Sequence, residues 1–331
     1  MPTAAALAPS LCPLKVVIPG GSGHLGTLLA RAFHDRGDRV VVLSRRPAHA
    51  PAPFVEWDGR KPGRWIEEID GADVVVNLAG RSVDCRYDAK RRAEILWSRV
   101  ESTRAIGAAI ANAARPPRLW LQASSATIYA HRYDAPNDEI DGVLGGDEPD
   151  APDAWRFSVD VAKAWEQAAD EANAKTTRIV KMRMAMVMST IHGGPFDALL
   201  RQVRMGIGRL GDGRQWMSWI HERDFVRAIE WLIDSEDISG AVNLAAPKPL
   251  PNAQFMRILQ HAWHGRVGMP VSGWVLDLGA WLVRSETELV LKSRRVVPRR
   301  LLDDGFTFRY PEWPSAARDL CARWRGSGET W

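Results

Sequence analysis

The stretch KVVIPGGSGHLG, residues 15–26, decides the fold of this 331-residue chain. A short apolar run typical of a buried strand leads directly into a glycine-rich turn and then into a helix-like segment ending near Arg36. Glycines allow the chain to turn sharply and allow a phosphate to approach the backbone, and a following helix offers free amide groups to that phosphate. The order of strand, turn and helix therefore favours a dinucleotide site. The residues expected around its pyrophosphate are Gly20, Gly21, Ser22, Gly23, His24, Leu25 and Gly26.

Strand-like runs alternate with helix-length segments through the first half of the chain. The runs are almost continuously apolar, as expected for parallel strands that are covered on both faces. This alternation predicts an α/β fold, a Rossmann doubly wound parallel sheet. The expected strands are residues 15–19, 39–44, 54–57, 72–80, 118–129 and 177–188, and the expected helices are 25–36, 89–114 and the segment containing WRFSVDVAKAWE at 155–166.

The regular alternation fades after Met188, where glycine and proline become frequent. Helices expected at 224–235, 252–263 and 273–284 are mixed there with short strands such as 241–245. This composition predicts a smaller, mixed lobe that covers the carboxyl ends of the sheet. The predicted organisation is a flexible arm at 1–14, a nucleotide-binding domain at 15–182 to which 219–246 returns, and a C-terminal substrate lobe at 183–218 and 247–331.

Composition narrows the class of protein. Hydrophobic residues at 46% and charged residues at 25% are ordinary for a globular protein. The three cysteines are far apart and none belongs to a CxxC pair, which favours a reducing, cytoplasmic location. No apolar run reaches the ~18 residues of a membrane-spanning helix, so no membrane association is expected.

The charged and metal-ligating residues do not form a recognisable binding motif. The net charge of +4 is mild and mostly dispersed, so no nucleic-acid partner is expected. The one basic cluster, KSRRVVPRR at 292–300, is interpreted as a solvated helix face. His261 and His264 lie one helical turn apart, but no third ligand is apparent, and no metal is expected.

The end of the second strand indicates which cofactor the turn would bind. Ser44, Arg45 and Arg46 stand where an NAD-binding protein usually carries an acidic residue for the ribose 2′-hydroxyl. Because arginine instead accommodates a 2′-phosphate, NADP(H) is expected in preference to NAD(H), although two solvated loop arginines would look the same in sequence. Asp58 is expected near the adenine. The residues expected beside the ribose and nicotinamide are Asn77, Leu78, Ala79, Gly80 and Ser124.

Several motifs resemble the extended short-chain dehydrogenase/reductase superfamily, in its NAD(P)-dependent epimerase/dehydratase branch. They are the glycine turn, NLAG at 77–80, SSATIY at 124–129 and WIHERDF at 219–225. A narrower resemblance, to an atypical subfamily with a conserved C-terminal domain of unknown function, is carried by NLAGRSVDCRYD, SRVEST, AKAWE and SRRVVPRRLLDDGFTFRYP at 293–311. The resemblance covers nearly the whole chain beyond residue 14. It implies an NADP-type cofactor and a homodimer through the helices near 89–114 and 153–173, but no named reaction.

The superfamily's catalytic pair, a tyrosine and a lysine spaced YxxxK, is absent. The chain has four tyrosines, and none is followed by lysine at the fourth position. Lys163 has Val159 four residues before it, and the alternative register places Ala162 and Ser158 in the two positions. Lys163 is left as a candidate ribose contact or a solvated helix residue.

The serine of the superfamily's catalytic group is retained as Ser125, while its asparagine position aligns with Arg99. Ser125 is expected to contact a bound carbonyl or the nicotinamide. Tyr129, His131 or Tyr133, which follow the fifth strand, could supply a proton if the fold places one of them at the nicotinamide. Tyr129 is taken with Ser125 as the catalytic candidate.

Three further residues are candidates for the substrate side. Trp216 and Trp219 are candidates for lining a pocket, and Arg183 is open to two interpretations, a substrate contact or a pairing with an acid.

Two functions fit these observations. One is an NADP(H)-dependent oxidoreductase or epimerase-like enzyme that acts on an unknown carbonyl or sugar-like small molecule. The other is a non-catalytic NADP(H)-binding regulator or redox sensor with a protein partner. Both require the glycine turn.

Overall fold

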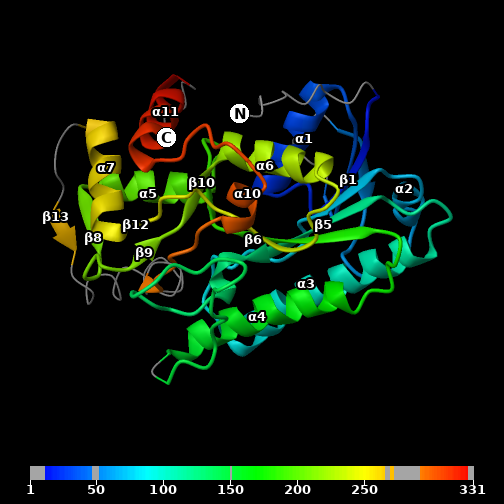
Figure 1. Ribbon diagram of the computed structural model, residues 1–331, viewed down its shortest axis with the longest axis horizontal. Helices are drawn as coiled ribbons and strands as arrows, with labels where there is room; N and C mark the ends of the chain where they lie inside the picture. The colour runs from blue at the N-terminus through cyan, green and yellow to red at the C-terminus, as the bar shows by residue number, and fades with distance from the viewer. Residues whose placement is uncertain (1–11, 47–51, 150, 265–268, 272–290, 327–331) are drawn as a thin grey trace.

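A seven-stranded parallel sheet forms the centre of the molecule (Figure 1). The computed structural model describes residues 12–46, 52–149, 151–264, 269–271 and 291–326. The strand order β11-β6-β5-β4-β1-β2-β3 is that of a doubly wound sheet, with its crevice beside β1 and β4. The predicted fold class is confirmed. The strands are β1 (Lys15–Pro19), β2 (Arg39–Ser44), β3 (Phe54–Glu56), β4 (Val74–Asn77), β5 (Leu119–Ser125), β6 (Arg178–Met184) and β11 (Gly240–Leu244).

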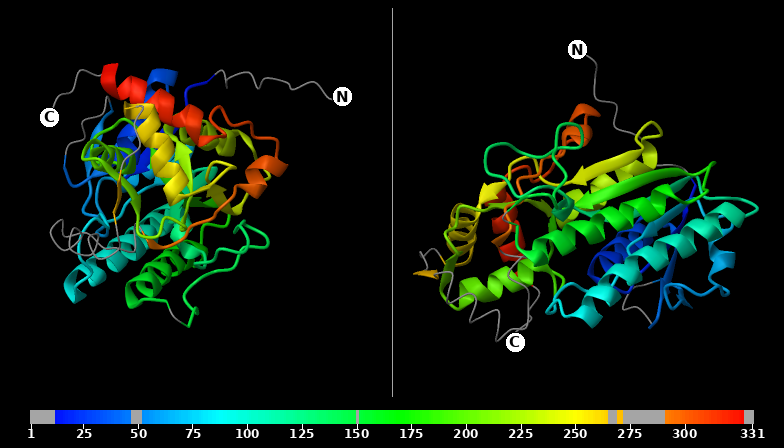
Figure 2. Two further views of the ribbon diagram at one scale, coloured as in Figure 1. Left: turned by 90° about the vertical axis from the view of Figure 1, so that its left-hand side faces the viewer. Right: turned by 90° about the horizontal axis from the view of Figure 1, so that it is seen from below.

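Helices cover both faces of the sheet because alternate strand residues point to opposite sides. Val16 and Ile18 pack with α1 and α6 on one face, whereas Val17 packs with α3 on the other. In Figure 1, α1 and α6 lie above the sheet, and α3 and α4 lie below it; the right-hand view of Figure 2 shows α3 and α4 side by side. The helices are α1 (His24–Arg36), α2 (Ile66–Ile69), α3 (Ala89–Asn112), α4 (Asp153–Asp170) and α6 (Glu222–Asp234).

Three of the expected strands differ from the structure. The run expected at 72–80 is a strand only over Val74–Asn77. The run expected at 118–129 leaves the sheet after Ser125 and forms a short 3₁₀ helix, η1 (Ala126–Ile128). The run expected at 177–188 is divided at Ala185 into β6 and a separate strand, β7 (Met186–Met188). β7 pairs with β10 (Trp219–His221) outside the main sheet. Apolar composition correctly predicted that each of these two runs contains a strand of the sheet, but it carried no sign of where the chain turns away.

A second lobe has its own apolar core. Phe255 stacks on Trp313 with ring centroids 3.9 Å apart, and both side chains are fully buried. The helix expected at 273–284 lies outside the described residues. The elements of this lobe are α5 (Pro195–Arg204), β8 (Ile207–Leu210), β9 (Trp216–Met217), β12 (Leu250–Pro251), α7 (Asn252–His264), β13 (Met269–Val271) and α11 (Trp313–Gly326).

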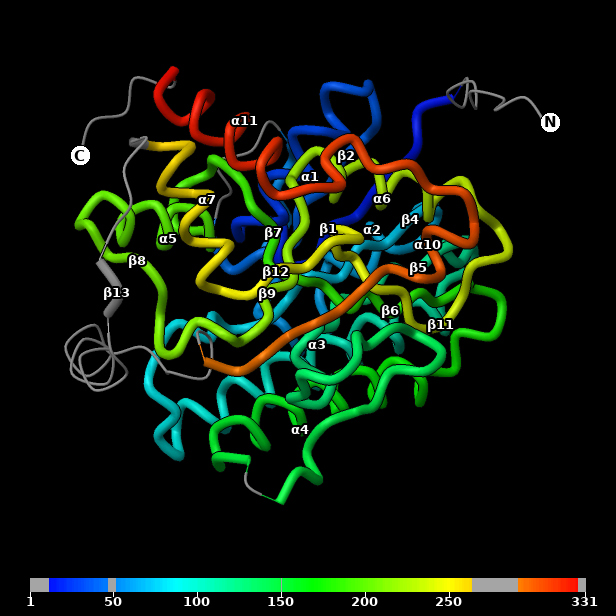
Figure 3. The backbone as a smooth tube through the Cα atoms, turned by 60° about the vertical axis from the view of Figure 1, so that its left-hand side comes forward, coloured from blue at the N-terminus to red at the C-terminus, as the bar shows by residue number. Residues whose placement is uncertain are grey.

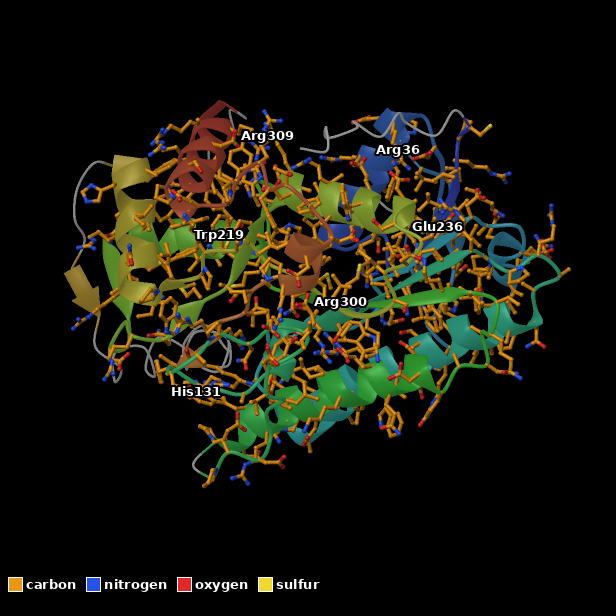
Figure 4. All side chains as sticks on the ribbon, viewed as in Figure 1. Arg36, His131, Trp219, Glu236, Arg300 and Arg309 are labelled. Carbon is orange, nitrogen blue, oxygen red and sulfur yellow. The ribbon has the colours of Figure 1, made fainter. Side chains whose placement is uncertain are left out.

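The C-terminal segment contacts both lobes. Figure 3 shows the chain crossing from the second lobe to the edge of the sheet at α10 (Arg299–Asp303) and returning to α11. Phe306 and Phe308 belong to the apolar core of the sheet. Arg300, labelled in Figure 4, donates hydrogen bonds to the carbonyl oxygens of Ser239 and Ala241 at β11. Part of the segment assigned by sequence to the substrate lobe therefore packs on the sheet.

The basic cluster at 292–300 is not a solvated helix face, so that interpretation was wrong. Most of it is extended, and Lys292 is only 2% exposed. The Lys292 ammonium donates to the Thr127 carbonyl oxygen at 2.8 Å, and Val296 is fully buried. Charge composition suggested a surface, but the long-range contact with η1 buries the segment. Among the described residues, no helix is long and apolar enough to cross a membrane.

Asp224 provides a test of how the C-terminal segment is held. Its fully buried carboxylate accepts hydrogen bonds at 2.7 Å from the backbone amides of Arg309, labelled in Figure 4, and Tyr310. We expect Asp224→Asn to lower the free energy of unfolding by about 2–4 kcal/mol, because one acceptor oxygen and the charge are lost. Chemical denaturation measures this change. The control is Asp234→Asn on the exposed face of the same helix, and an equal loss in both variants would contradict the assignment.

Candidate functional site

A large open cavity lies at the carboxyl ends of the parallel strands. It has a volume of about 1270 Å³ and extends from the glycine turn, across the ends of β2, β4 and β5, to the start of α5. Ligands of open α/β sheets bind in this crevice. The predicted cofactor residues that line it are Gly20, Ser22, Gly23, His24, Leu25, Gly26, Ser44, Arg45, Asp58, Leu78, Ala79, Gly80 and Ser124.

The glycine turn is packed too closely for side chains at three of its positions. Gly20 has φ of 79°, and a Cβ there would lie 2.7 Å from the Ala79 amide nitrogen. A Cβ on Gly21 would lie 2.9 Å from the Ile18 carbonyl oxygen. A Cβ on Gly26 would lie 2.3 Å from the Gly21 Cα. Gly23, which caps α1, meets only the Gly20 carbonyl oxygen at 3.4 Å, so a side chain there would enter the cavity. This cradle and the first amides of α1 fit a pyrophosphate.

A smaller cavity of about 430 Å³ opens beside the turn and is lined by Ser22, Ser44, Arg45 and Arg46. The Ser22 and Ser44 hydroxyl oxygens lie 2.5 Å apart, and the Arg46 amide donates to Ser44 Oγ at 3.3 Å. The end of β2 thus gathers two hydroxyl groups and two exposed arginines. Such a group of donors suits a phosphate.

Asp58 lies on the rim of the larger cavity, in the loop after β3. Its carboxylate accepts hydrogen bonds from the backbone amides of Arg60 and Lys61 at 2.9 and 2.8 Å. The hydrogen bond from Lys61, followed by that from Arg60, lowers the pKa of Asp58. The carboxylate is therefore held in its charged form at the predicted adenine end.

Asn77 and Ser124 shape the floor of the cavity in different ways. Asn77 is fully buried and does not line the cavity; its Oδ1 accepts from the Ala79 amide, and its Nδ2 donates to Gln122. It therefore fixes the loop at Leu78 to Gly80 and does not itself face the cavity. Ser124 lines the cavity and donates to Glu166 Oε1 at 2.6 Å.

The positions of the missing catalytic pair lie on α4, as the alignment predicted, but they supply no reactive group. Ala162 is 2% exposed and packs in an apolar cluster with η1. Lys163 is absent from the cavity lining; a Cβ on Gly146 would meet its Nζ at 3.4 Å, on the side of the acidic surface loop. This placement does not fit a ribose contact. Ser125 does line the cavity, and its Oγ accepts from the Thr127 amide at 3.2 Å.

Tyr129 does not line the cavity, because a buried polar network holds its side chain elsewhere. Its hydroxyl is 3.0 Å from Asn243 Oδ1, to which it donates, and 2.9 Å from Arg183 Nη1, from which it accepts. Arg183 also forms a two-pronged ion pair with Glu166, at 2.8 and 2.9 Å. Burial raises the pKa of Tyr129, so the phenol stays protonated and engaged. This placement does not fit the predicted role of proton donor, and Arg183 pairs with an acid.

The other candidates on the substrate side also lie outside the cavity lining. His131, labelled in Figure 4, accepts from the Ser293 amide at its Nδ1, and its ring contacts Tyr133. Trp219 is fully buried, and Trp216 is covered by the Arg295 guanidinium, 4.2 Å from a ring centroid. These residues pack the junction with the C-terminal segment. In the described part of the chain, no group of three His, Cys, Asp or Glu side chains suits a metal ion.

The structure shows features of three lining residues that the sequence did not predict. His24 was predicted only through its place in the turn, but its Nε2 lies 2.8 Å from Ser189 Oγ, and burial lowers its pKa. Arg99 and Trp165 also line the cavity, although Arg99 was noted only as a changed position. The SRVEST and AKAWE motifs contained the available signal, because they carry these two residues.

The parallel sheet, the glycine turn and the cavity at the strand ends define a dinucleotide-binding Rossmann protein. The sequence profile of the NAD dependent epimerase/dehydratase family matches residues 16–245, and that of a domain of unknown function, DUF1731, matches residues 271–320. The chain belongs to the NAD dependent epimerase/dehydratase family and is an NAD(P)-binding protein of the epimerase type. Both resemblances noted in the sequence are thereby confirmed.

Similar proteins span nearly the whole chain. The epimerase family protein SSP1921 of Staphylococcus saprophyticus is 30% identical over 92% of this chain and 98% of its own length. A crystal structure of human epimerase family protein SDR39U1 with NADPH is 28% identical, with a TM-score of 0.78 over 93% of this chain and 99% of that chain. A nucleoside-diphosphate sugar epimerase from Corynebacterium glutamicum is 28% identical, with a TM-score of 0.72 over 94% of this chain and 59% of that chain.

The buried network predicts a structural role for the Tyr129 hydroxyl. We expect Tyr129→Phe to lower the free energy of unfolding by about 1–3 kcal/mol, because Arg183 and Asn243 each lose a buried hydrogen bond. NADPH affinity should be unchanged. Thermal unfolding and fluorescence titration measure the two quantities, with Tyr133→Phe at an exposed position as the control. Unchanged stability with loss of NADPH turnover would instead support an acid role for Tyr129.

Proposed function

We propose that the protein binds NADP(H) in preference to NAD(H). The observation that carries this proposal is the small cavity formed by Ser22, Ser44, Arg45 and Arg46 directly beside the larger one. It offers hydroxyl and guanidinium donors where the adenosine ribose of a dinucleotide would lie. The NADPH in the crystal structure of human SDR39U1 supports the same preference.

The chain's own residues would hold the dinucleotide along the cavity. The amides at the start of α1 would bind the pyrophosphate, with Gly23 leaving space for it. Leu78 to Gly80, positioned by Asn77, would follow the ribose, and Ser125 would lie toward the nicotinamide. When bound, the cofactor would supply a hydride acceptor or donor.

We further propose an oxidoreductase activity on a carbonyl or sugar-like small molecule, without the tyrosine and lysine pair. Ser125 is the polar group at the end of β5 that lines the cavity and is not held by an acid; the neighbouring Ser124 is bound to Glu166. Its hydroxyl would donate a hydrogen bond to the oxygen of the reacting carbonyl and stabilise the negative charge that develops there. Its chemical contribution is therefore polarisation of the carbonyl, and the proton that the resulting alkoxide takes up would come from water in the open cavity.

Other features support proposals about location and assembly. We propose a cytoplasmic protein, since the cysteines within the described residues, Cys12, Cys85 and Cys321, are all unpaired. A homodimer through the outer faces of α3 and α4 remains a proposal based on the resemblance.

The cofactor preference has a direct test. Arg45→Gln should weaken NADPH binding by about 10- to 100-fold, because one charge-assisted hydrogen bond contributes about 1.5–3 kcal/mol. NADH binding should change little, since NADH has no 2′-phosphate. Titration with quenching of tryptophan fluorescence measures both affinities. Arg39→Gln, exposed at the start of the same strand, is the matched control. Equal affinity of the unmodified protein for NADPH and NADH would contradict the preference.

The role of Ser125 is tested by turnover. Ser125→Ala should reduce the rate of NADPH oxidation with a panel of aldehydes, ketones and keto sugars by about 10²- to 10³-fold, the usual effect of removing one oxyanion donor. NADPH affinity should be retained. The control is Ser82→Ala, at a cavity serine in the loop after β4. Full activity in Ser125→Ala would overturn the assignment.

One observation favours a second candidate function, a non-catalytic NADP(H)-binding regulator or redox sensor. No tyrosine is among the described residues that line the cavity, and Tyr129 is held by Arg183 and Asn243. A protein of this kind would bind NADPH tightly and show no turnover across the carbonyl panel. Binding to its protein partner would then depend on the cofactor.

A further inference from the structure

Arg99 is an unusual cation in the wall of the large cavity. It lies on α3, and its half-buried side chain is next to Gly80. Its guanidinium carbon lies 4.9 Å from the ring centroid of Trp165 on α4. Its Nη1 donates to two carbonyl oxygens, those of Arg81 and Ile95, each at 3.0 Å. One nitrogen and one face of the guanidinium are thus fixed by the protein.

The remaining edge of this guanidinium is not used by the described residues. Among the described residues, its Nε and Nη2 have no hydrogen-bond partner, and no carboxylate lies within ion-pair distance of it. The two acids on the same helix that line the cavity are already paired, Glu94 with Arg81 and Glu101 with Arg60. Nε and one terminal nitrogen of a guanidinium form the fork that binds a carboxylate or a phosphate through two parallel hydrogen bonds.

Partial removal from water makes this arrangement costly without an anion. Desolvation lowers the pKa of Arg99 to about 10, so the side chain is still charged at neutral pH. A buried charge is normally paired. Arg183 on β6 illustrates the usual solution, because Glu166 binds its fork at 2.8 and 2.9 Å. Arg99 has the same chemistry with no acid supplied by the described chain.

Trp165 forms the neighbouring wall of the cavity. Its side chain is only 6% exposed, and its ring lies against the Arg99 guanidinium. Gly80 completes the local shape, because a Cβ there would lie 3.3 Å from the Arg99 guanidinium carbon and would crowd it.

We propose that Arg99 binds an anionic group, a carboxylate or a phosphate, of the substrate, with Trp165 as a wall of that subsite. The proposal rests on the proposed function, in which the adjoining part of the cavity holds NADP(H). The cofactor's own phosphates have separate donors, at the start of α1 and at Arg45 and Arg46. The anion at Arg99 is therefore assigned to the second ligand, and the substrate class becomes acidic carbonyl compounds or phosphate esters.

The test is isothermal titration of the full chain, saturated with NADP⁺, with inorganic phosphate and with acetate at constant ionic strength. Acetamide serves as the uncharged analogue of acetate. We expect at least one anion to bind the unmodified protein, and Arg99→Gln to weaken it by about 10-fold or more, as expected for loss of a charge-assisted hydrogen bond. Acetamide should not bind. The control is Arg104→Gln. Arg104 lies on α3, as Arg99 does, and forms an exposed ion pair with Glu171 at the end of α4, so this change should leave anion binding unchanged.

Two further measurements distinguish failure of the anion-binding proposal from failure of the proposed cofactor binding. Arg99→Lys retains the charge but not the fork, so it should fold and bind the anion with intermediate affinity. NADPH affinity is measured for every variant. Anion binding that is absent, or equal in Arg99→Gln and the unmodified protein, would overturn the proposal. A parallel loss of NADPH affinity in Arg99→Gln would also overturn it, by assigning the anion to the cofactor. Failure of the unmodified protein to bind NADPH would instead reject the proposed function.

Discussion

The close approach of the glycine turn to the end of β4 is the constraint on which the cavity depends. A side chain at Gly20 would collide with the backbone at Leu78 and Ala79, and one at Gly26 would collide with Gly21. Because these contacts are made by backbone atoms, neither partner can move aside without disturbing the sheet. They place the start of α1 and the loop after β4 on opposite sides of one crevice. A dinucleotide site follows from this geometry.

The buried ion pair between Glu166 and Arg183 lies beside the positions on α4 where the superfamily has its catalytic tyrosine and lysine. Glu166, on α4, binds Arg183 and Ser124, and Arg183 in turn holds the Tyr129 hydroxyl. These groups satisfy one another and leave no acid of this set free for proton transfer. Breaking such a network is expensive, because each remaining charge would lose its partner in a dry environment. The network therefore stabilises the floor of the cavity, while Ser125 remains available above it.

The C-terminal segment joins the two lobes through polar contacts that only the folded chain brings together. His221, at the end of β10, is fully buried, stacks on Tyr310 with ring centroids 3.9 Å apart, and lies 3.0 Å from Asp319 Oδ2. Burial lowers the pKa of His221 to about 4, so this ring is neutral under ordinary conditions. Arg323 binds both Asp319 and Glu222 at the start of α6. The second lobe is thus fixed over the strand ends, which closes one side of the cavity.

The sequence by itself determined the fold class, the doubly wound arrangement of the parallel sheet and the glycine turn. Turn chemistry and apolar periodicity are local properties of the chain. The sequence also singled out Arg45, which follows the predicted strand 39–44, and Ser125, which lies within the predicted run 118–129; both line the cavity. Tertiary structure decided the direction of individual side chains. Tyr129 is held by partners 54 and 114 residues away, and the basic cluster at 292–300 is buried by a contact 165 residues away. Arg99 became a candidate only when the fold showed which acids were already paired. No local pattern encodes such distant partners, and they decide which polar groups remain available to a ligand.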